Sequence, residues 1–518
     1  MPTYLSPGVY VEEVEAGQRP IEGVGTAVAA FVGFAEKGPL NTPTLITNWT
    51  QFTQTFGDFV EGSYLAHAVF GYIQNGGSAA YIIRIGAESA GNGQAPKELP
   101  AGAPQTTLGH YKVTAIESAN GKSPDVTVEV ADSGTENAPE GAIKLTVRAN
   151  GRPTEEYDPV VPDRRADKTN NVATVVNAKS KLVKVEELAQ SAALEPVAKG
   201  KKSLVAPPAP AATGEGVGAA DYVGDTAART GFSSLEAIED VTIVAVPDLM
   251  SAYQRGAIDL ETVHSVQQAV ITHCELMGNR MAIIDPPPGL NAQQIKDWRM
   301  NQAGYDSRYA ALYWPWAKTF DPATGRNILV PPSGHAAGIW ARTDESRGVH
   351  KAPANEVVRG AIALETVITK AEHDLLNPIG VNALRAFPGR GIRIWGARTL
   401  SSDPAWRYIN VRRLFNYMEE SILNGTQWVV FEPNDDALWA RVRRTISAFL
   451  VNEWRKGALF GLTPDEAFYV KCDRETNPAE AIDAGQVTCQ IGIAPVKPAE
   501  FVVFQLSQFS GGTSLVNE

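Results

Sequence analysis

Two aspartates in the middle of the chain are the residues best placed for catalysis. Asp248 and Asp285 each end a short apolar run, VTIVAVPD and MAIIDPPPG, which predicts a buried strand. Carboxylates at the carboxyl ends of parallel strands are where α/β enzymes keep catalytic or metal-binding groups. Pro247 and Pro286 stand beside them, and Asp and Pro are both favoured in turns and at helix starts. A structural role in a turn is therefore the favoured interpretation.

The other candidates lack the spacing that their chemistry requires. His264 and His273 lie nine residues apart on a predicted helix, so they point to opposite sides and cannot share a metal ion. PPSGHAAG lacks the strand, turn and helix that expose a nucleophilic serine, and FPGRGIRIWG lacks the Lys-Ser/Thr of a phosphate loop. We predict no catalytic, cofactor-binding or metal site, and no enzymatic activity.

Strands and helices alternate around the two aspartates. Predicted strands at 241–248, 281–289 and 309–320 are separated by predicted helices at 257–280 and 291–304. Nearer the start, apolar strands in TAVAAFVGFAEKGP and GSAAYIIRIG flank the helical segment SYLAHAVFGYIQNGG. Strands separated by helices of this length imply a parallel sheet with right-handed crossovers.

Composition limits the class of protein. The 518 residues suggest several domains, and the net charge of −12 argues against broad nucleic-acid binding. No apolar run reaches membrane-spanning length, and the first residues do not resemble a signal peptide. Three cysteines fit a reducing compartment and free thiols, with a Cys472–Cys489 bridge as the alternative.

Two stretches poor in large apolar residues, GAESAGNGQAPKELPAGAPQTT and LVAPPAPAATGEGVGAADYVG, bracket short alternating segments. We predict an α+β or α/β multidomain fold whose α/β core carries an inserted β-rich outer module and is followed by an α+β domain. The expected divisions are an N-terminal arm and linker at 1–22, core at 23–90, the module at 91–220, core at 221–375, a C-terminal domain at 376–494 and a C-terminal arm at 495–518.

Both ends of the chain read as strands without a partner. YLSPGVYVEEVE alternates over residues 4–15 and is followed by AGQRPIEGVG, the composition of a mobile tether. FVVFQLSQFS alternates near the other end, after APVKPAE. A lone strand leaves backbone donors and acceptors unpaired, so each should join a sheet. The residues expected to make these contacts are Tyr4, Val9, Tyr10, Val11, Val14, Phe501, Val502, Val503, Phe504 and Leu506.

A predicted helix over residues 438–456 carries a basic stripe. Arg441, Arg444 and Arg455 fall within about 60° of one another, opposite its apolar side. In an acidic chain such a stripe could bind an acidic protein partner. The alternative is a solvated basic face.

Several motifs, in this order along the chain, resemble the contractile tail sheath proteins of phages, phage-tail-like bacteriocins and extracellular contractile injection systems. They are SPGVYVEEV, TAVAAFVGFAEKGP, IWGARTL, WRYINVRRL, FEPN, WRKGALFG and APVKPAEFVVFQLSQ. The middle segments TVVNAKSKLVKV and DYVGD with RTGFSSLEAIEDVTIVAVPD are also similar to the family pattern. The similarity extends over most of the chain and is weakest at residues 91–140.

The resemblance implies hexameric rings stacked around an inner tube, and contraction that drives the tube through a target envelope. It implies that both terminal arms add strands to the sheets of neighbouring subunits and that a C-terminal helix faces the tube, which would use Arg441, Arg444 and Arg455. Implied partners are further copies, the inner tube, and baseplate and terminal cap proteins, without nucleic acid or membrane insertion. The implied location is the cytoplasm during synthesis and assembly, then a released particle. A static shell or surface-layer protein and an α/β hydrolase remain the alternatives.

Overall fold

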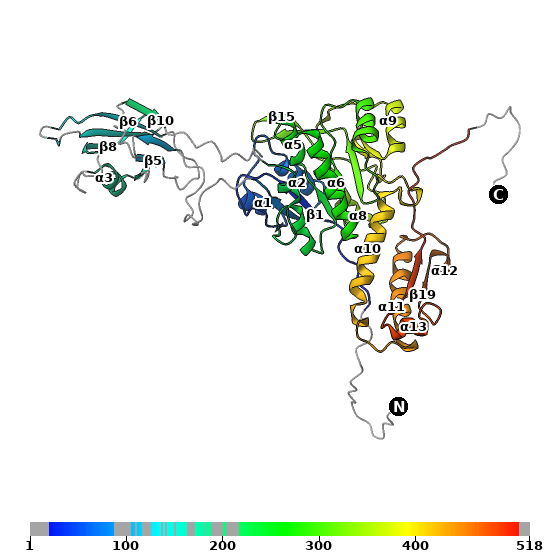
Figure 1. Cartoon of the computed structure of the whole chain (residues 1–518). Helices are drawn as coiled ribbons and strands as arrows, with labels where there is room; N and C mark the ends of the chain where they lie inside the picture. The colour runs from blue at the N-terminus through cyan, green and yellow to red at the C-terminus, as the bar shows by residue number, and fades with distance from the viewer. Residues whose placement is uncertain are drawn as a thin grey trace, which may run out of the picture. The chain divides into compact units, whose positions relative to one another are not determined.

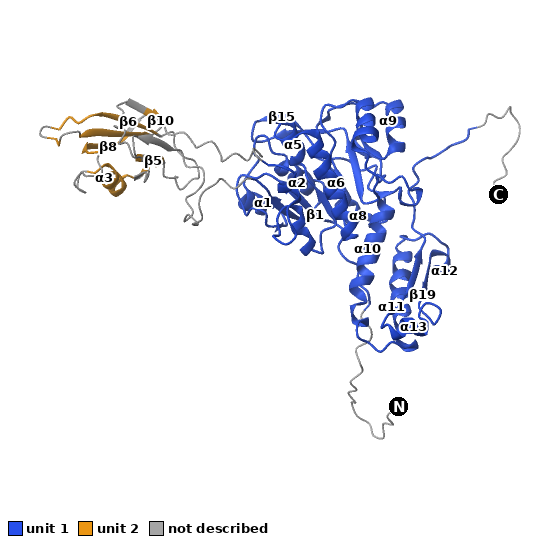
Figure 2. Ribbon diagram, in the orientation of Figure 1, with its two compact units in different colours: residues 1–87, 213–518 blue, residues 88–212 orange. Residues whose placement is uncertain are grey.

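The computed structural model of the chain describes residues 20–86 and 217–506. Between them it describes the stretches 105–108, 111–115, 126–135, 138–139, 142–149, 152–162, 171–180, 182–187 and 200–203. Two compact units result (Figure 2): residues 1–87 together with 213–518, and residues 88–212. The bounds that we expected for the inserted module, residues 91–220, are close to the bounds of the second unit.

An eight-stranded sheet forms the centre of the larger unit (Figure 1), in the order β18-β17-β13-β12-β11-β1-β3-β2. The six central strands run parallel, while β2 and β18 pair antiparallel at the two edges. The strands are β1 Val28–Gly33, β2 Thr44–Ile46, β3 Ala79–Arg84, β11 Ile243–Ala245, β12 Met281–Ile284, β13 Ala310–Trp314, β17 Val381–Phe387 and β18 Gly391–Trp395.

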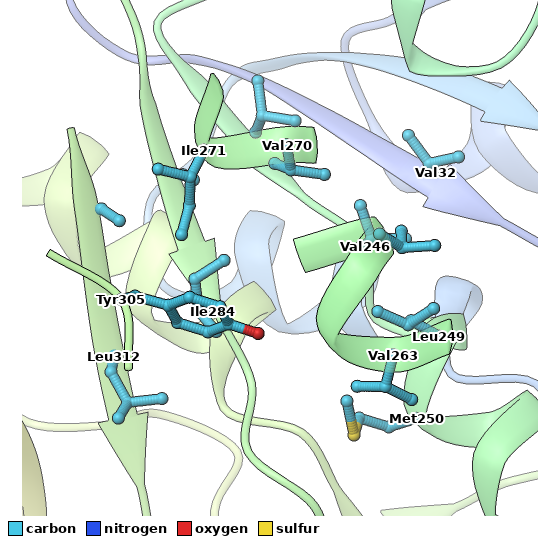
Figure 3. Packing of buried hydrophobic residues seen from close by; sticks show 14 of the residues in the cluster. Val32, Val246, Leu249, Met250, Val263, Val270, Ile271, Ile284, Tyr305 and Leu312 are labelled. Carbon is cyan, nitrogen blue, oxygen red and sulfur yellow. The ribbon is translucent and has the colours of Figure 1, made fainter. Parts of the chain in front are cut away.

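Helices cover both faces of this sheet, because successive side chains of a strand point to opposite sides. In β1, Ala29 and Phe31 pack with α1, α2 and α8, whereas Ala30 and Val32 pack with α5, α6 and α7. Figure 3 shows part of the buried cluster on the side of α5, α6 and α7, where Val32 lies near Val246 and Leu249. The helices are α1 Trp49–Phe56, α2 Leu65–Gln74, α4 Ala219–Val223, α5 Asp248–Gln254, α6 Leu260–Met277, α7 Ala292–Asp297, α8 Ser333–Arg347 and α9 Lys370–Leu376.

Two features differ from the sequence prediction. The expected strand 309–320 is two strands on either side of Pro315: β13 lies in the large sheet, and β14 (Ala317–Asp321) pairs with β15 (Arg326–Val330) and β16 (Ala363–Leu364). The large sheet also extends past residue 376, where we expected the C-terminal domain to begin, because β17 pairs in parallel with β13. The α/β part therefore continues through β18.

The last part of the chain forms two long helices and a small sheet. These elements are α10 Ile409–Gly425, α11 Asp436–Arg455, α12 Pro464–Ala467, β19 Phe468–Lys471, α13 Ala479–Asp483 and β20 Gln490–Ile493. A cluster that includes Leu414, Met418, Ile446 and Leu450 joins α10 to α11. The first long helix does not begin at Asp403 and Pro404, although an Asp followed by a Pro is a common helix start. Instead they begin a separate 3-10 turn, Pro404–Trp406, in which the Asp403 side chain accepts from the Ala405 N–H.

The smaller unit, residues 88–212, has two antiparallel sheets, β10-β6-β7-β8 and β4-β5-β9. Its elements are β4 Gln105–Leu108, β5 Tyr111–Ala115, β6 Val126–Asp132, β7 Ile143–Ala149, β8 Arg152–Val160, α3 Val172–Lys179, β9 Val183–Glu187 and β10 Gly200–Ser203. Residues from both sheets and from α3, including Val113, Val147 and Val176, form one buried cluster.

Candidate functional site

Asp248 joins three segments of the chain at the carboxyl end of β11. Its carboxylate accepts hydrogen bonds from Phe34 N (2.6 Å), from Ser63 Oγ (2.9 Å) and from Tyr64 N. Burial raises the pKa of Asp248 to about 6. The strand order reverses between β1 and β11, which is where open α/β sheets bind ligands. Here the Asp248 carboxylate accepts its hydrogen bonds from donors of the chain itself, which supports the structural interpretation.

Asp285 has the corresponding role at the end of β12. Its Oδ1 accepts from the Ser333 backbone N–H at 3.0 Å, where α8 begins. Burial raises the pKa of Asp285 to about 7. Asp248 and Asp285 thus bind different segments, and neither contacts the other through a hydrogen bond.

The remaining chemical candidates are packing residues. His264 lies against Trp298, with ring centroids 5.9 Å apart, whereas His273 lies beside Phe232 and Arg280. Trp314 and Trp316 are fully buried. Among the described residues no group of His, Cys, Asp and Glu could hold a metal ion. Cys274, Cys472 and Cys489 are free thiols, as expected.

Residues 20–27, which we call the N-terminal strap, lie along α10. Ile21 is only 8% exposed and packs against Gly425, where a Cβ would stand 2.5 Å from Ile21 Cγ1. Val24 N donates to Ser421 Oγ at 3.1 Å, and Arg413 Nη2 donates to the Thr26 carbonyl at 2.8 Å. The prediction of a mobile tether over residues 16–25 is therefore wrong for its described part, because burial and hydrogen bonds hold that part on α10.

Glu500 fixes the root of the C-terminal arm. Arg398 donates to its carboxylate through Nε at 2.8 Å and through Nη2 at 2.6 Å. Tyr408 Oη (3.1 Å) and Asn377 Nδ2 (2.7 Å) donate to the same group. Five residues before Glu500, Pro495 forms an isolated antiparallel β-bridge with Leu459. The segment APVKPAE, which precedes the C-terminal arm, is thus held at both ends by contacts within the subunit, which leaves few residues free to bend.

Beyond Glu500 the chain is extended and solvent-exposed. Residues 501–506 form no strand with the described part of the chain. Their apolar side chains are 68–99% exposed: Phe501, Val502, Val503, Phe504 and Leu506. A run of exposed apolar side chains is unfavourable in an isolated subunit and marks an interaction segment. The corresponding N-terminal residues, Tyr4, Val9, Tyr10, Val11 and Val14, lie outside the described residues.

The small sheet of β19 and β20 has two open edges. The strands pair antiparallel from Phe468↔Ile493 to Lys471↔Gln490, and within the described residues neither has a second strand beside it. A groove of about 410 Å³, the β20 groove, runs between β20 and α10. Another of about 700 Å³, the β19 groove, runs between β19 and α11. Unpaired edges of this kind are templates for a further strand.

The basic stripe lies on α11 as expected. Arg444 and Arg455 are exposed. Arg441 is half-buried, 3.8 Å from a Glu432 carboxylate oxygen and 5.3 Å from the centre of the Trp428 ring. The sequence pattern missed Arg443, which borders the β19 groove and donates to the Cys472 carbonyl at 2.8 Å. Only the position of β19 reveals that role.

Among the described residues, no helix combines the length and the apolar character that crossing a membrane requires.

Comparison with known proteins places these features in a family. The family model for the phage tail sheath protein central domain matches residues 215–400, and that for the phage tail sheath C-terminal domain matches residues 401–509. The tail sheath protein of Burkholderia phage BcepMu is 24% identical over 522 residues, covering 96% of this chain and 95% of that protein. That of Vibrio phage KVP40 is 27% identical, but the match covers 51% of this chain and 40% of the relative.

A putative prophage major tail sheath protein of Pseudomonas aeruginosa is 27% identical, over 46% of this chain and 61% of that protein. Two solved structures share the fold over 98% of this chain. The helical sheath of the anti-feeding prophage in its contracted state has a TM-score of 0.59, 23% identity and full coverage of that chain. The contracted sheath of the extracellular contractile injection system PVC has a TM-score of 0.58, 22% identity and 99% coverage. Since the two family models together match more than half of its residues, the chain belongs to the phage tail sheath protein family.

Proposed function

We propose that this chain is the structural subunit of a contractile sheath, which polymerises around an inner tube and shortens to drive that tube through a target envelope. The observation that carries the proposal is a complementary pair of features in a member of the sheath family. The chain has an exposed, extended apolar segment at 501–506 and a two-stranded sheet with open edges.

Strand exchange between copies would satisfy both features. Residues 4–14 of one copy, with Tyr4, Val9, Tyr10, Val11 and Val14, would pair with the sheet of a neighbour. The segment with Phe501, Val502, Val503, Phe504 and Leu506 would pair with the sheet of another. Each added strand satisfies backbone groups on an open edge and buries alternate apolar side chains. The links between subunits would then persist while the subunits shift.

The remaining partners follow from the surface chemistry and the family. Arg441, Arg444 and Arg455 would contact an acidic surface of the inner tube, and the first and last rings would contact baseplate and cap proteins. We assign the chain no catalytic role. Free energy stored in subunit packing would drive contraction, and Asp248 and Asp285 support the fold.

Electron microscopy of purified chain mixed with its tube protein tests the proposal. Long, narrow tubes that convert to short, wide ones are expected, whereas a static shell or surface-layer protein would give one lattice state. Removing residues 1–15 should give a folded monomer that does not polymerise. Ordered tubes from that truncated chain would contradict the strand-exchange mechanism.

A further inference from the structure

We infer that Cys472 and Cys489 form a modification site, at which an oxidising medium converts the two thiols to a disulfide that joins the strands of the small sheet. The oxidant that this reaction requires is a low-molecular-weight disulfide, such as glutathione disulfide. The bridge lies within one subunit, so it goes beyond the proposed function and does not depend on it.

The register of the small sheet places the two cysteines opposite each other. The last pair of the ladder is Lys471↔Gln490, and the next position along both strands is Cys472 and Cys489. Residues directly opposite in an antiparallel pair have Cα atoms about 4.5–5.5 Å apart and side chains on the same face. A disulfide spans Cα distances of about 4.4–6.8 Å, so this pairing suits a bridge.

Asn477 holds the two strand ends together just beyond the ladder. Its side chain is buried, and Nδ2 donates to Cys472 Sγ at 3.9 Å and to the Thr488 carbonyl at 3.0 Å. Its Oδ1 accepts from Thr488 N at 2.6 Å. The residue before Cys489 is therefore tied to the side chain that contacts Cys472, which keeps the two thiols near each other.

The two thiols differ in access to solvent. Cys472 is fully buried, whereas Cys489 is partly exposed. Burial raises the pKa of both thiols, that of Cys489 to about 12, and a hydrogen-bond contact between the two thiols contributes to both pKa values. Because the thiolate is the reacting form, oxidation of the folded subunit should be slow at neutral pH. Cys489 is the thiol that a dissolved oxidant reaches first.

The oxidation proceeds in two balanced steps. The Cys489 thiolate attacks one sulfur of glutathione disulfide, which forms a bond between Cys489 and one glutathione and releases the other as a thiolate. The Cys472 thiolate then attacks Cys489 Sγ, forms the Cys472–Cys489 bond and releases the second glutathione. The protein loses two electrons and two protons, and both end on the two glutathione thiols.

The bridge would tie β19 to β20. It closes a loop of sixteen residues, 473–488, and loop closure restricts the opened state more than the native one. Within the described residues this sheet has only two strands, so β19 and β20 pair with each other alone. Oxidation should therefore make separation of the two strands rarer.

Peptide mapping of the full-length chain tests the site. The reduced chain is incubated under native conditions with an excess of glutathione disulfide, then denatured, alkylated and digested for mass spectrometry. A peptide pair linked through Cys472 and Cys489 should accumulate, while Cys274 is alkylated in full. Cys274 is the matched control, because it is equally buried but belongs to the cluster around α6.

Each other result of the mapping would overturn the inference. These results are two free thiols after the incubation, glutathione that stays on Cys489 without a link to Cys472, and a link through Cys274.

Hydrogen exchange measures the effect of the bridge on the sheet. Amides of Phe468–Lys471 and Gln490–Ile493 that exchange through strand separation should do so at least about tenfold more slowly in the oxidised chain than in the reduced chain. Cys489→Ser, treated with the same oxidant, should exchange at the rate of the reduced chain. Cys472→Ala, which removes the other thiol, should give the same result. Equal rates in the linked and the reduced natural chain would overturn the role assigned to the bridge.

Discussion

Ionisation of the buried Asp285 carboxyl lowers the free energy of unfolding at neutral pH. Its folded pKa of about 7 exceeds the value near 4 of an unfolded chain, so the native state binds the proton more tightly between these limits. Its contribution to stability is therefore greatest below about pH 4 and is lost as the pH rises to about 7. Asp285→Asn retains an acceptor for Ser333 N and does not ionise. The melting temperature of this variant, relative to the natural chain, should increase steadily from pH 4.5 to 7.5 in scanning calorimetry.

Asp306 provides the matched control for Asp285. Hydrogen bonds from the Ser402 hydroxyl and backbone N–H lower the pKa of its carboxyl, so its titration falls below this pH range. Asp306→Asn should lower the melting temperature by an amount that does not change between pH 4.5 and 7.5. A pH-independent difference for Asp285→Asn as well would contradict the argument from burial.

The arginine stripe of α11 should be needed for assembly on the tube. Charge reversal at Arg441 and Arg455, which do not border the β19 groove, tests the tube contact without altering that groove. Each exposed pair contributes only about 0.2–1 kcal/mol, but the contact repeats in every subunit. Co-sedimentation of this double variant with tube should be lost and tube-free polymers retained, and binding of the natural chain should weaken with salt. Normal extended particles would refute the assignment.

The N-terminal strap and α10 form one packed element, with Gly425 as the position that allows it. A Cβ at residue 425 would stand 2.5 Å from Ile21 Cγ1, so Gly425→Ala should displace Ile21 from its site. The expected result is faster cleavage after Glu22 by a glutamate-specific protease and faster amide exchange in residues 20–27. Leu423→Ala, at an exposed position on the same turn of the helix, should leave both rates unchanged. Equal rates in the Gly425→Ala chain would mean that the strap does not depend on this contact.

The two compact units should fold independently of each other. The buried cluster of residues 88–212 contains no residue of the larger unit, and the described clusters of the larger unit contain none of the smaller one. Replacing residues 88–212 by a short Gly-Ser linker should therefore leave the melting transition of the remaining unit and its polymerisation unchanged. A folded deletion protein that forms no polymer in electron micrographs would show that the module takes part in assembly.

Local pattern was sufficient for much of the fold. The alternation of apolar strands with helices predicted the parallel sheet. Periodicity reports how side chains are distributed around one element, so it also placed Arg441, Arg444 and Arg455 on one stripe. The ordered motifs identified the family because they recur along most of the chain.

Tertiary structure alone decided what the same residues contact. Asp248 receives donors from Phe34, Ser63 and Tyr64, which lie more than 180 residues earlier in the chain. The Gly-rich tether became a bound strap because Ile21 meets a glycine 404 residues later, a contact that composition does not encode. The grooves beside β19 and β20 likewise depend on which helix lies beside each strand. Such contacts follow from how distant segments pack and pair in register, and no local pattern in the sequence contains that information.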